Sequence, residues 1–344
     1  MSGTWMFKSA KKIFSILTLL SIQIFSQEKL FLIEEGEMYG FINKEGTIVI
    51  QPMLTTRSNF FAGYSKQIQH HWFDNDVNFI NTKGEVAITT THEDAGVFSE
   101  GLAKFRKAIF FTNGKWGFID TTGAEKIAPL YSESGNFHDG RAMVIVRPFL
   151  FPQFTPDKFG YINYSGELVI PYQFDAAGDF SEYRAPVRIG NKRGFIDTTG
   201  TILIPIEFNA VKNFSCGLAG VRKDSLWGFI DTAGETILSF QFEEVRNFSE
   251  DIALVKKNGK WEFVDKKGNE AFSLSFQNAL SFSEKKTAFQ QNNLWGYIDS
   301  TGSTIVSPQF LEAASFQNGL AFVETETEKG YVDHTGKFVW KTKK

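Results

Sequence analysis

A segment similar to Trp227-Gly-Phe-Ile-Asp-Thr-Ala-Gly234 recurs along this chain of 344 residues. Nine copies end in glycine, at positions 46, 84, 123, 166, 200, 234, 268, 302 and 336. The last five intervals between these glycines are all 34 residues. A fixed period of this size indicates a repeat architecture, in which each unit stacks on its neighbours. The number of domains therefore does not follow from chain length, because a repeat array can have any length.

Each unit is predicted to be a meander of short antiparallel strands joined by tight turns. In the clean unit from 214 to 244, strands are expected at 218–222, 227–231 and 235–239. Asp231 ends the second strand, and its side chain can bond backbone N–H groups two residues on. Gly234 can then take the positive φ of a bulged hairpin turn. Gly228 leaves room for the close approach of another backbone or ring.

A second recurring signal is a Phe-Ser turn, whose phenylalanine is expected to pack against the neighbouring unit. It occurs at positions 98, 180, 214, 248 and 282. A lone unit cannot bury enough apolar surface to offset ordering, which costs roughly 1–2 kcal/mol per residue for the backbone. Stacked neighbours supply the missing burial, so stability should depend on contacts between adjacent units.

The pattern resembles the WG-repeat (KWG-repeat) family, named for a Lys-Trp-Gly-Phe-Ile-Asp core. Residues 115–120 match this core fully, and residues 226–231 and 294–299 match it from the Trp onward. Some copies depart from it: the Trp is replaced by Tyr39, Phe159, Arg193 and Lys329, and the Gly by Glu262. The resemblance covers residues 28–344. It implies an all-β repeat scaffold without assigned chemistry, and it carries over no catalytic residues.

The expected fold is an all-β tandem array of nine three-stranded antiparallel meanders, each of about 34 residues. An open or superhelical array is favoured over the alternative, a closed β-propeller-like ring. Propeller blades commonly have four strands, whereas the pattern here gives three. Both ends of the array also look complete, because residues 30–33 supply a first strand and residues 337–340 a last one. The pattern gives no sheet that is divided between the termini.

Residues 1–26 differ from the array and read as a secretory signal peptide. Lys8, Lys11 and Lys12 precede a mostly apolar stretch at 13–24, and Ser26 suits a cleavage site. The alternative, a membrane anchor, needs about 20 apolar residues. We therefore expect an exported protein that is periplasmic, on the cell surface or secreted. Its array spans 27–344 and the mature chain has no transmembrane segment.

Extra length falls in one hairpin of three consecutive units, in about residues 60–166. Most units have six positions between the end of the first strand and the Trp position, as from Val221 to Trp227, but units two to four have ten, eleven and fifteen. Consecutive insertions on one edge of a solenoid often build a binding face. The candidate binding residues are the aromatic and neighbouring side chains His71, Trp72, Phe73, Phe110, Phe111, Phe149, Phe151 and Phe154. The alternative is that these hairpins pack on one another as a satellite core.

Other chemistry has weaker support. The recurring Trp residues at 116, 227, 261 and 295 could stack on sugars, although their periodicity favours a core role. The acidic position after the Phe-Ser turn, at 100, 139, 182, 250 and 284, is interpreted as a solvated turn charge. No metal site, cofactor or catalytic motif is predicted, and a formal net charge of −3 gives no footprint for nucleic acid.

The sequence thus predicts a non-catalytic exported scaffold that mediates protein–protein interaction. The alternative is a glycan-binding or cell-envelope-binding repeat protein that uses surface aromatic residues. The partner would be a protein or an envelope glycan.

Overall fold

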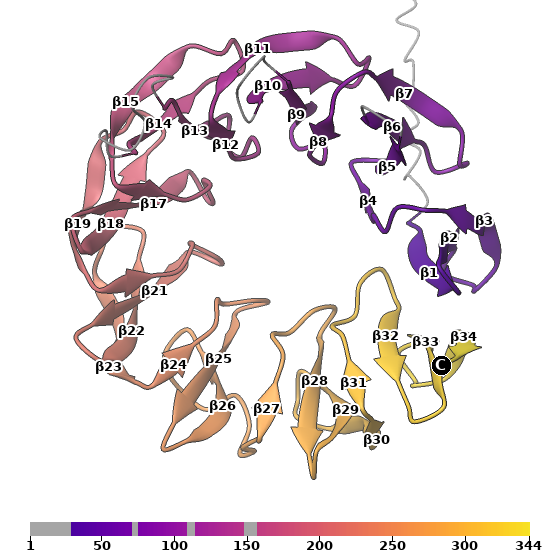
Figure 1. Ribbon diagram of the computed structural model, residues 1–344. Coiled ribbons are helices and arrows are strands. Elements are labelled where there is room, and N and C mark those ends of the chain that lie inside the picture. Colours follow the sequence, from indigo (N-terminus) through magenta and orange to yellow (C-terminus); the bar gives the residue numbers. More distant parts are fainter. Residues whose placement is uncertain (1–28, 71–74, 109–113, 148–156) are drawn as a thin grey trace, which may run out of the picture.

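The chain forms a closed ring of nine small antiparallel sheets, a nine-bladed β-propeller, in a computed structural model (Figure 1). The structure describes residues 29–70, 75–108, 114–147 and 157–344. Blade 1 (β1–β3) lies beside blade 9 (β31–β34), so the first and last described blades meet. The expected all-β repeat is confirmed, the preferred open array is wrong, and the alternative of a ring is correct.

Four strand positions define a blade, in chain order. The short first strands are β4 (Phe60–Phe61), β8 (Asp94–Ala95), β12 (Glu133–Ser134), β16 (Ala176–Ala177), β20 (Ala210–Val211), β24 (Glu244–Val245), β27 (Asn278–Ala279) and β31 (Glu312–Ala313). The second strands are β1 (Phe31–Glu35), β5 (Tyr64–His70), β9 (Leu102–Lys107), β13 (Ala142–Ile145), β17 (Arg184–Ile189), β21 (Leu218–Lys223), β25 (Ile252–Lys257), β28 (Lys286–Gln291) and β32 (Ala321–Glu324).

The third strands carry the Trp-Gly motif or its substitutes. They are β2 (Met38–Ile42), β6 (Asn75–Ile80), β10 (Lys115–Asp120), β14 (Phe159–Ile162), β18 (Lys192–Asp197), β22 (Leu226–Asp231), β26 (Lys260–Asp265), β29 (Leu294–Asp299) and β33 (Glu328–Val332). The fourth strands are β3 (Ile48–Leu54), β7 (Val86–Thr90), β11 (Glu125–Tyr131), β15 (Leu168–Phe174), β19 (Ile202–Phe208), β23 (Thr236–Phe242), β30 (Thr304–Phe310) and β34 (Phe338–Lys343).

The expectation of three strands per unit is wrong for most blades. Among the described residues, seven sheets have four strands, and only blades 1 and 7 have three. The strand missing from the expectation is the short one before the Phe-Ser turn. A two-residue strand has no alternation of apolar and polar side chains, so it leaves no periodic signal in the sequence.

An Asp or Asn at the end of each third strand starts the expected turn. Asp231 Oδ1 accepts hydrogen bonds from the N–H groups of Ala233 and Glu235, both at 2.9 Å. Gly234 follows at φ 89°, and its N–H donates to the carbonyl of Asp231 at 3.0 Å. This is a type I turn closed by a left-handed glycine, a common three-residue hairpin connection. Asn43 makes the same two side-chain bonds in blade 1, at 3.2 and 2.9 Å.

These turns should make the protein sensitive to acid. The Thr122 hydroxyl and backbone N–H groups lower the pKa of Asp120 to about 2. Side-chain hydrogen bonds from Asn269 and Thr301 lower the pKa of Asp265 and that of Asp299. A lowered folded-state pKa stabilises the fold above the unfolded pKa of about 3.9, and this stabilisation is lost as the pH falls towards the folded value.

We therefore expect a variant with all three aspartates replaced by asparagine to lose less stability between pH 5 and pH 2 than the unmodified protein. Asparagine forms the same turn in blade 1 and does not titrate. Urea unfolding at stepped pH values measures the difference. Equal loss of stability in both proteins would contradict the role of these turns.

The Phe-Ser turns are two-residue hairpins of type I′, and Figure 1 shows them pointing towards the centre of the ring. Both central residues have positive φ, as at Cys216 (55°) and Gly217 (81°). Type I′ turns suit the twist of a hairpin and favour glycine. In blade 8, however, the second central residue is Lys285, at φ 58°.

Replacing Lys285 with glycine is expected to stabilise the protein by about 1 kcal/mol, because a left-handed conformation strains any residue with a Cβ. The reciprocal change Gly217→Lys should destabilise it by a similar amount, since a Cβ at Gly217 meets nothing within 4 Å and adds only backbone strain. Thermal and urea unfolding of both variants measure the effects. A loss of stability in Lys285→Gly would contradict the argument.

The glycine of the Trp-Gly pair is required by the fourth strand. A Cβ on Gly228 would lie 2.6 Å from the carbonyl oxygen of Leu238, at the bulge where β23 crosses β22. The expected close approach of another backbone is therefore confirmed. Blade 7 shows the consequence of losing the glycine, because Glu262 occupies the position there. Its sheet has no fourth strand: the backbone of residues 270–276 pairs with β26 only at two isolated bridges, although Phe272 and Phe276 pack on Phe263.

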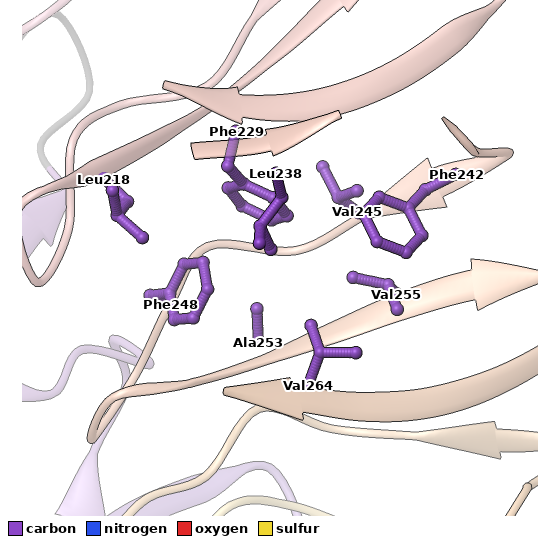
Figure 2. Close-up of a cluster of buried hydrophobic side chains, with 9 residues drawn as sticks. All are labelled: Leu218, Phe229, Leu238, Phe242, Val245, Phe248, Ala253, Val255 and Val264. Carbon is purple, nitrogen blue, oxygen red and sulfur yellow. The ribbon is translucent and has the colours of Figure 1, made fainter. Parts of the chain in front are cut away.

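Adjacent blades are joined by a pair of aromatic rings at each of eight interfaces. The turn Phe of one blade packs on the third-strand aromatic of the preceding blade, as the repeat predicted. The ring centroids lie 4.7 to 5.0 Å apart in Phe41–Phe60, Phe79–Phe98, Phe118–Phe137, Tyr161–Phe180, Phe195–Phe214, Phe229–Phe248, Phe263–Phe282 and Tyr297–Phe316. Figure 2 shows one such core, in which Phe229 and Leu238 of blade 6 meet Phe248 and Val255 of blade 7.

The ring closes through a contact of the same kind as the others. In blades 2 to 9, the glycine of the Asp turn lies against the fourth-strand region of the preceding blade, as Gly234 does against Ile204. In blade 1, Gly46 lies in the same way against Val339 of blade 9. No sheet is divided between the ends of the described chain. Complete end blades therefore do not exclude a ring, because blade-to-blade packing alone can close it.

Candidate binding site at the ring closure

The binding residues predicted from the sequence lie outside the described residues. His71, Trp72 and Phe73 fall in 71–74, Phe110 and Phe111 in 109–113, and Phe149, Phe151 and Phe154 in 148–156. The flanking strands are described, and they place all three segments in the hairpin between the second and third strands of blades 2, 3 and 4. The binding role assigned to these segments stays a prediction.

The recurring tryptophans contribute to the core. Trp261 is buried within a hydrophobic cluster, and Trp116, Trp227 and Trp295 are half-buried against others. Cationic side chains also cover some of the rings. Lys212 Nζ, for example, lies 5.3 Å from the centroid of Trp227. These contacts favour the core interpretation over an open sugar-stacking surface.

The recurring carboxylates hold neighbouring blades together. They are turn residues, as expected, and each accepts a hydrogen bond from a backbone N–H in the turn of the next blade. The donors lie at 2.8 to 3.0 Å in the pairs Asp139–Glu100, Tyr183–Asp139, Gly217–Glu182, Lys285–Glu250 and Gly319–Glu284. Hydrogen bonds to an ionised group are stronger than neutral ones. Cys216, a free thiol, occupies the acidic position in blade 6.

The candidate site lies at the closure, where blade 1 meets blades 9 and 2. Among the described residues, blade 1 has no short first strand, and in blade 2 the short strand β4 pairs beside the turn, at Phe60–Ser65 and Phe61–Tyr64. Two hollows of about 400 and 650 Å³ lie along β1 at this point, and both are lined by Leu32, Asn59, Phe322 and Tyr331. We call the two hollows together the closure slot. Pockets of a few hundred Å³ are typical of ligand sites.

The backbone of β1 faces this slot. In blade 6 the carbonyl of Gly220 accepts a bond from Lys212 N–H, which lies just beyond the short strand, at 2.8 Å. Leu32 is the equivalent residue of blade 1, because Ile33 pairs with Gly40 as Val221 pairs with Gly228. The Leu32 carbonyl accepts instead from the Tyr331 hydroxyl of blade 9, at 2.8 Å. A side chain therefore occupies the hydrogen-bonding position that the backbone fills in blade 6.

The slot is mixed in polarity. At one end Lys329 of blade 9 pairs with Glu34 of blade 1, with 3.2 Å between Nζ and Oε1, and Arg57 of blade 2 lines the same hollow. Towards the other end the walls are Leu30, Leu320 and backbone of the central turns. Burial raises the pKa of Tyr331 to about 12, so its hydroxyl remains a hydrogen-bond donor at neutral pH.

Sequence reasoning did not find this slot. The sequence held one signal of it. In every other unit a segment precedes the first predicted strand, but in unit one that segment falls within residues 1–26, which were assigned to a leader. The consequence was hidden because that segment was not recognised as a strand. The partners of Leu32 are also far away in the chain, since Tyr331 lies 299 residues from it.

The described part of the chain contains no group of three or more His, Cys, Asp or Glu side chains arranged to hold a metal ion. Within the same ranges, no helix has the length and apolar character needed to cross a membrane.

Comparisons with known proteins match this fold. A search of curated protein sequences gives no significant match. The ring is similar to a solved structure described as the crystal structure of the eukaryotic initiation factor, with a TM-score of 0.62 and 10% identity, covering 92% of this chain and 96% of that one. It is also similar to apo AztD from Citrobacter koseri, with a TM-score of 0.42 and 11% identity, covering 91% and 94%. At these identities the likeness concerns the fold alone.

The sequence itself matches one family model, described as the WG-containing repeat. The matched residues are 39–64, 79–108, 116–147, 159–192, 194–227, 227–261, 263–295 and 295–326. These eight matches run from blade 1 to blade 9, and each begins within a third strand, the strand that carries the Trp-Gly motif or its substitutes. The chain therefore belongs to the WG-repeat family.

Proposed function

We propose that this protein is a non-catalytic scaffold that binds a protein partner at the closure slot. One observation carries the proposal: among the described residues, β1 has no neighbouring strand on the side where two hollows open. An unpaired sheet edge presents backbone groups that another polypeptide can bond. The slot also joins apolar walls to a charged end, and interfaces between proteins combine such an apolar centre with a polar rim.

The rest of the ring supports a scaffold role. The acidic residues that recur in five blades each accept a hydrogen bond from a backbone N–H group of the neighbouring turn. Such bonds, with the aromatic pairs, fix one blade against the next. A rigid ring lowers the entropy lost on binding, so it suits a preorganised binding surface.

The three long hairpins form a second candidate surface in this proposal. Trp72, Phe110 and Phe151 lie in one hairpin of each of three consecutive blades, and consecutive insertions often build one face. Export through residues 1–26 belongs to the same proposal, because an envelope or secreted location decides which partners the protein meets. A glycan partner is the alternative that the tests below should separate.

Site-specific photocrosslinking tests the proposal. A photoreactive amino acid at Asn59, which is exposed and lines both hollows, should crosslink to a defined polypeptide in extracts of the producing cells. The matched control is Asn247, which precedes the turn Phe of blade 7 as Asn59 precedes Phe60. Mass spectrometry of the adduct identifies the bound segment. No polypeptide adduct, or the same adduct from both positions, would reject the closure slot.

A triple variant with Trp72, Phe110 and Phe151 replaced by serine separates the two surfaces. If the Asn59 adduct persists in this variant, the closure slot binds independently of the hairpins. If the adduct is lost while circular dichroism shows an intact fold, the hairpins are needed for binding. Competition by added oligosaccharides would favour the glycan alternative.

A further inference from the structure

The closure slot has the shape and chemistry of a missing strand. In blades 3 to 9 a backbone N–H that follows the short strand donates to the second strand. The distances are 2.7 to 2.9 Å for Gly96–Lys104, Gly135–Met143, Gly178–Pro186, Lys212–Gly220, Arg246–Leu254, Leu280–Ala288 and Ala314–Phe322. The equivalent acceptor in blade 1, the Leu32 carbonyl, has only the Tyr331 hydroxyl as partner among the described residues. No described residue therefore fills the position that a strand occupies in blades 3 to 9.

An aromatic ring is missing at the same place. Eight blade interfaces each contain a turn Phe stacked on a third-strand aromatic at 4.7 to 5.0 Å. At the ninth interface the third-strand aromatic is Tyr331, and no described turn Phe meets it. Phe31 contacts its ring from β1 at 5.4 Å. The larger hollow, of about 650 Å³, is lined by Tyr331, Leu320 and Ala314.

Two other blades show how Tyr331 would bind a strand. Tyr161 donates its hydroxyl to the carbonyl of Gly178, just beyond the short strand of the next blade, at 2.7 Å. Tyr297 donates in the same way to Ala314, at 2.8 Å. Tyr331 is the equivalent residue in blade 9, but it donates to Leu32 on the second strand of blade 1. With an added strand in place, the Tyr331 hydroxyl would donate to a carbonyl of that strand. The Leu32 carbonyl would then accept a hydrogen bond from a backbone N–H of the strand.

We propose that the closure slot binds an extended segment of a partner protein, which adds to β1 as the absent first strand of blade 1. This proposal rests on the proposed function and names the form of the partner. Addition of a strand to an exposed sheet edge is a recurring mode of peptide recognition. Main-chain hydrogen bonds hold such a segment, and pockets for its side chains select its sequence.

The other blades specify the sequence that fits. In blades 3 to 9, each short strand has a small or β-branched residue in its second position, and a phenylalanine follows three residues later. The segments are Ala95 to Phe98, Ser134 to Phe137, Ala177 to Phe180, Val211 to Phe214, Val245 to Phe248, Ala279 to Phe282 and Ala313 to Phe316. The partner segment should therefore carry a small residue and then a phenylalanine, whose ring packs on Tyr331.

A peptide from the chain itself is the probe. Residues 311–318 include the short strand β31 and the turn residue Phe316, whose ring packs on Tyr297. Tyr297 also donates its hydroxyl to Ala314 of this segment. Tyr331 is expected to contact a bound strand in the same way. We expect the fluorescein-labelled peptide to bind the full chain saturably in fluorescence anisotropy. The same peptide with Phe316→Ser should bind at least ten times more weakly. Equal binding of both peptides, or no binding of either, would overturn the proposal.

Protein variants locate the binding. Asn59→Trp should fill the slot and weaken peptide binding at least tenfold, whereas the matched variant Asn247→Trp should leave binding unchanged. Tyr331→Phe retains the ring but lacks the hydroxyl, so binding should survive with altered affinity. Melting temperatures near that of the unmodified protein confirm that each variant is folded. Equal weakening in Asn59→Trp and Asn247→Trp would contradict this location.

A shortened protein that begins at Gln27 shows whether the chain's own first residues or a partner segment fills the closure slot. If the peptide binds the full chain and this form alike, the slot is free for a partner. Binding to the shortened form alone would show that the chain's own first residues fill the slot, and would overturn the proposal.

The proposed function has a separate readout. A crosslink from Asn59 without peptide binding would retain a protein partner but reject strand addition, whereas loss of both results would reject the site altogether.

Discussion

Replacing Gly46 with alanine is expected to destabilise the protein by about 4 kcal/mol. Gly46 has φ 82°, so a Cβ there costs about 1 kcal/mol of backbone strain. The added methyl group would also overlap the carbonyl oxygen of Val339 in blade 9. Backbone cannot move aside as a flexible side chain can, and overpacking of this kind costs up to about 3 kcal/mol more. Urea unfolding, followed by tryptophan fluorescence and circular dichroism, measures the loss.

The matched control lies in the same blade. Gly36 also has a positive φ, 62°, but a Cβ there would meet nothing within 4 Å. Gly36→Ala should therefore cost only the backbone strain, about 1 kcal/mol. The difference between the two variants reports the contact between blades 1 and 9. Equal losses would mean that these blades do not touch in solution and that the array is open.

Replacing Gly228 with alanine is expected to destabilise the protein by about 3 kcal/mol. The new Cβ would lie 2.6 Å from the Leu238 carbonyl oxygen and 3.2 Å from the Phe240 nitrogen, both backbone atoms of β23. The register shift between Trp227 and Phe229 brings β23 this close to Gly228, so relief requires the strand to move outward. Loss of the fourth strand would then expose the apolar cluster that contains Leu238 and Phe242.

Blade 7 again provides a control within the chain. Glu262 already occupies the equivalent position, and the residues after β26 have only isolated bridges to it. Glu262→Ala should therefore change stability by no more than about 0.5 kcal/mol, as for an ordinary surface substitution. Hydrogen exchange of residues 236–242 shows whether Gly228→Ala frees the fourth strand. Protection unchanged from the unmodified protein would contradict the explanation of the Trp-Gly motif.

Much of the blade could be predicted from the sequence because it depends on local chemistry. Asp231 and Gly234 determine a hairpin turn through bonds that span at most four residues. Phe229 recurs at a fixed period, so a shared buried face followed from alternation along a strand. Its packing on Phe248 of the next blade followed from the same period. The short strand at 244–245 was missed because two residues cannot show a period.

The candidate site could not be predicted in the same way. The hairpin residues singled out by composition, such as Trp72 and Phe151, lie outside the described residues, and their role stays a prediction. The closure slot depends on Leu32 and Tyr331, which belong to the first and last blades. No local pattern indicates that these blades touch.

By itself, the sequence determined a periodic all-β chain, its turns, its buried face and its family, because each of these depends on residues close together or on the period itself. Only the tertiary structure decided between a ring and an open array. That choice depends on the small rotation from one blade to the next, summed over nine blades, and on whether Gly46 then meets Val339. The slot at the closure follows from the same geometry, because an unfilled strand position is visible only where the two ends of the array meet.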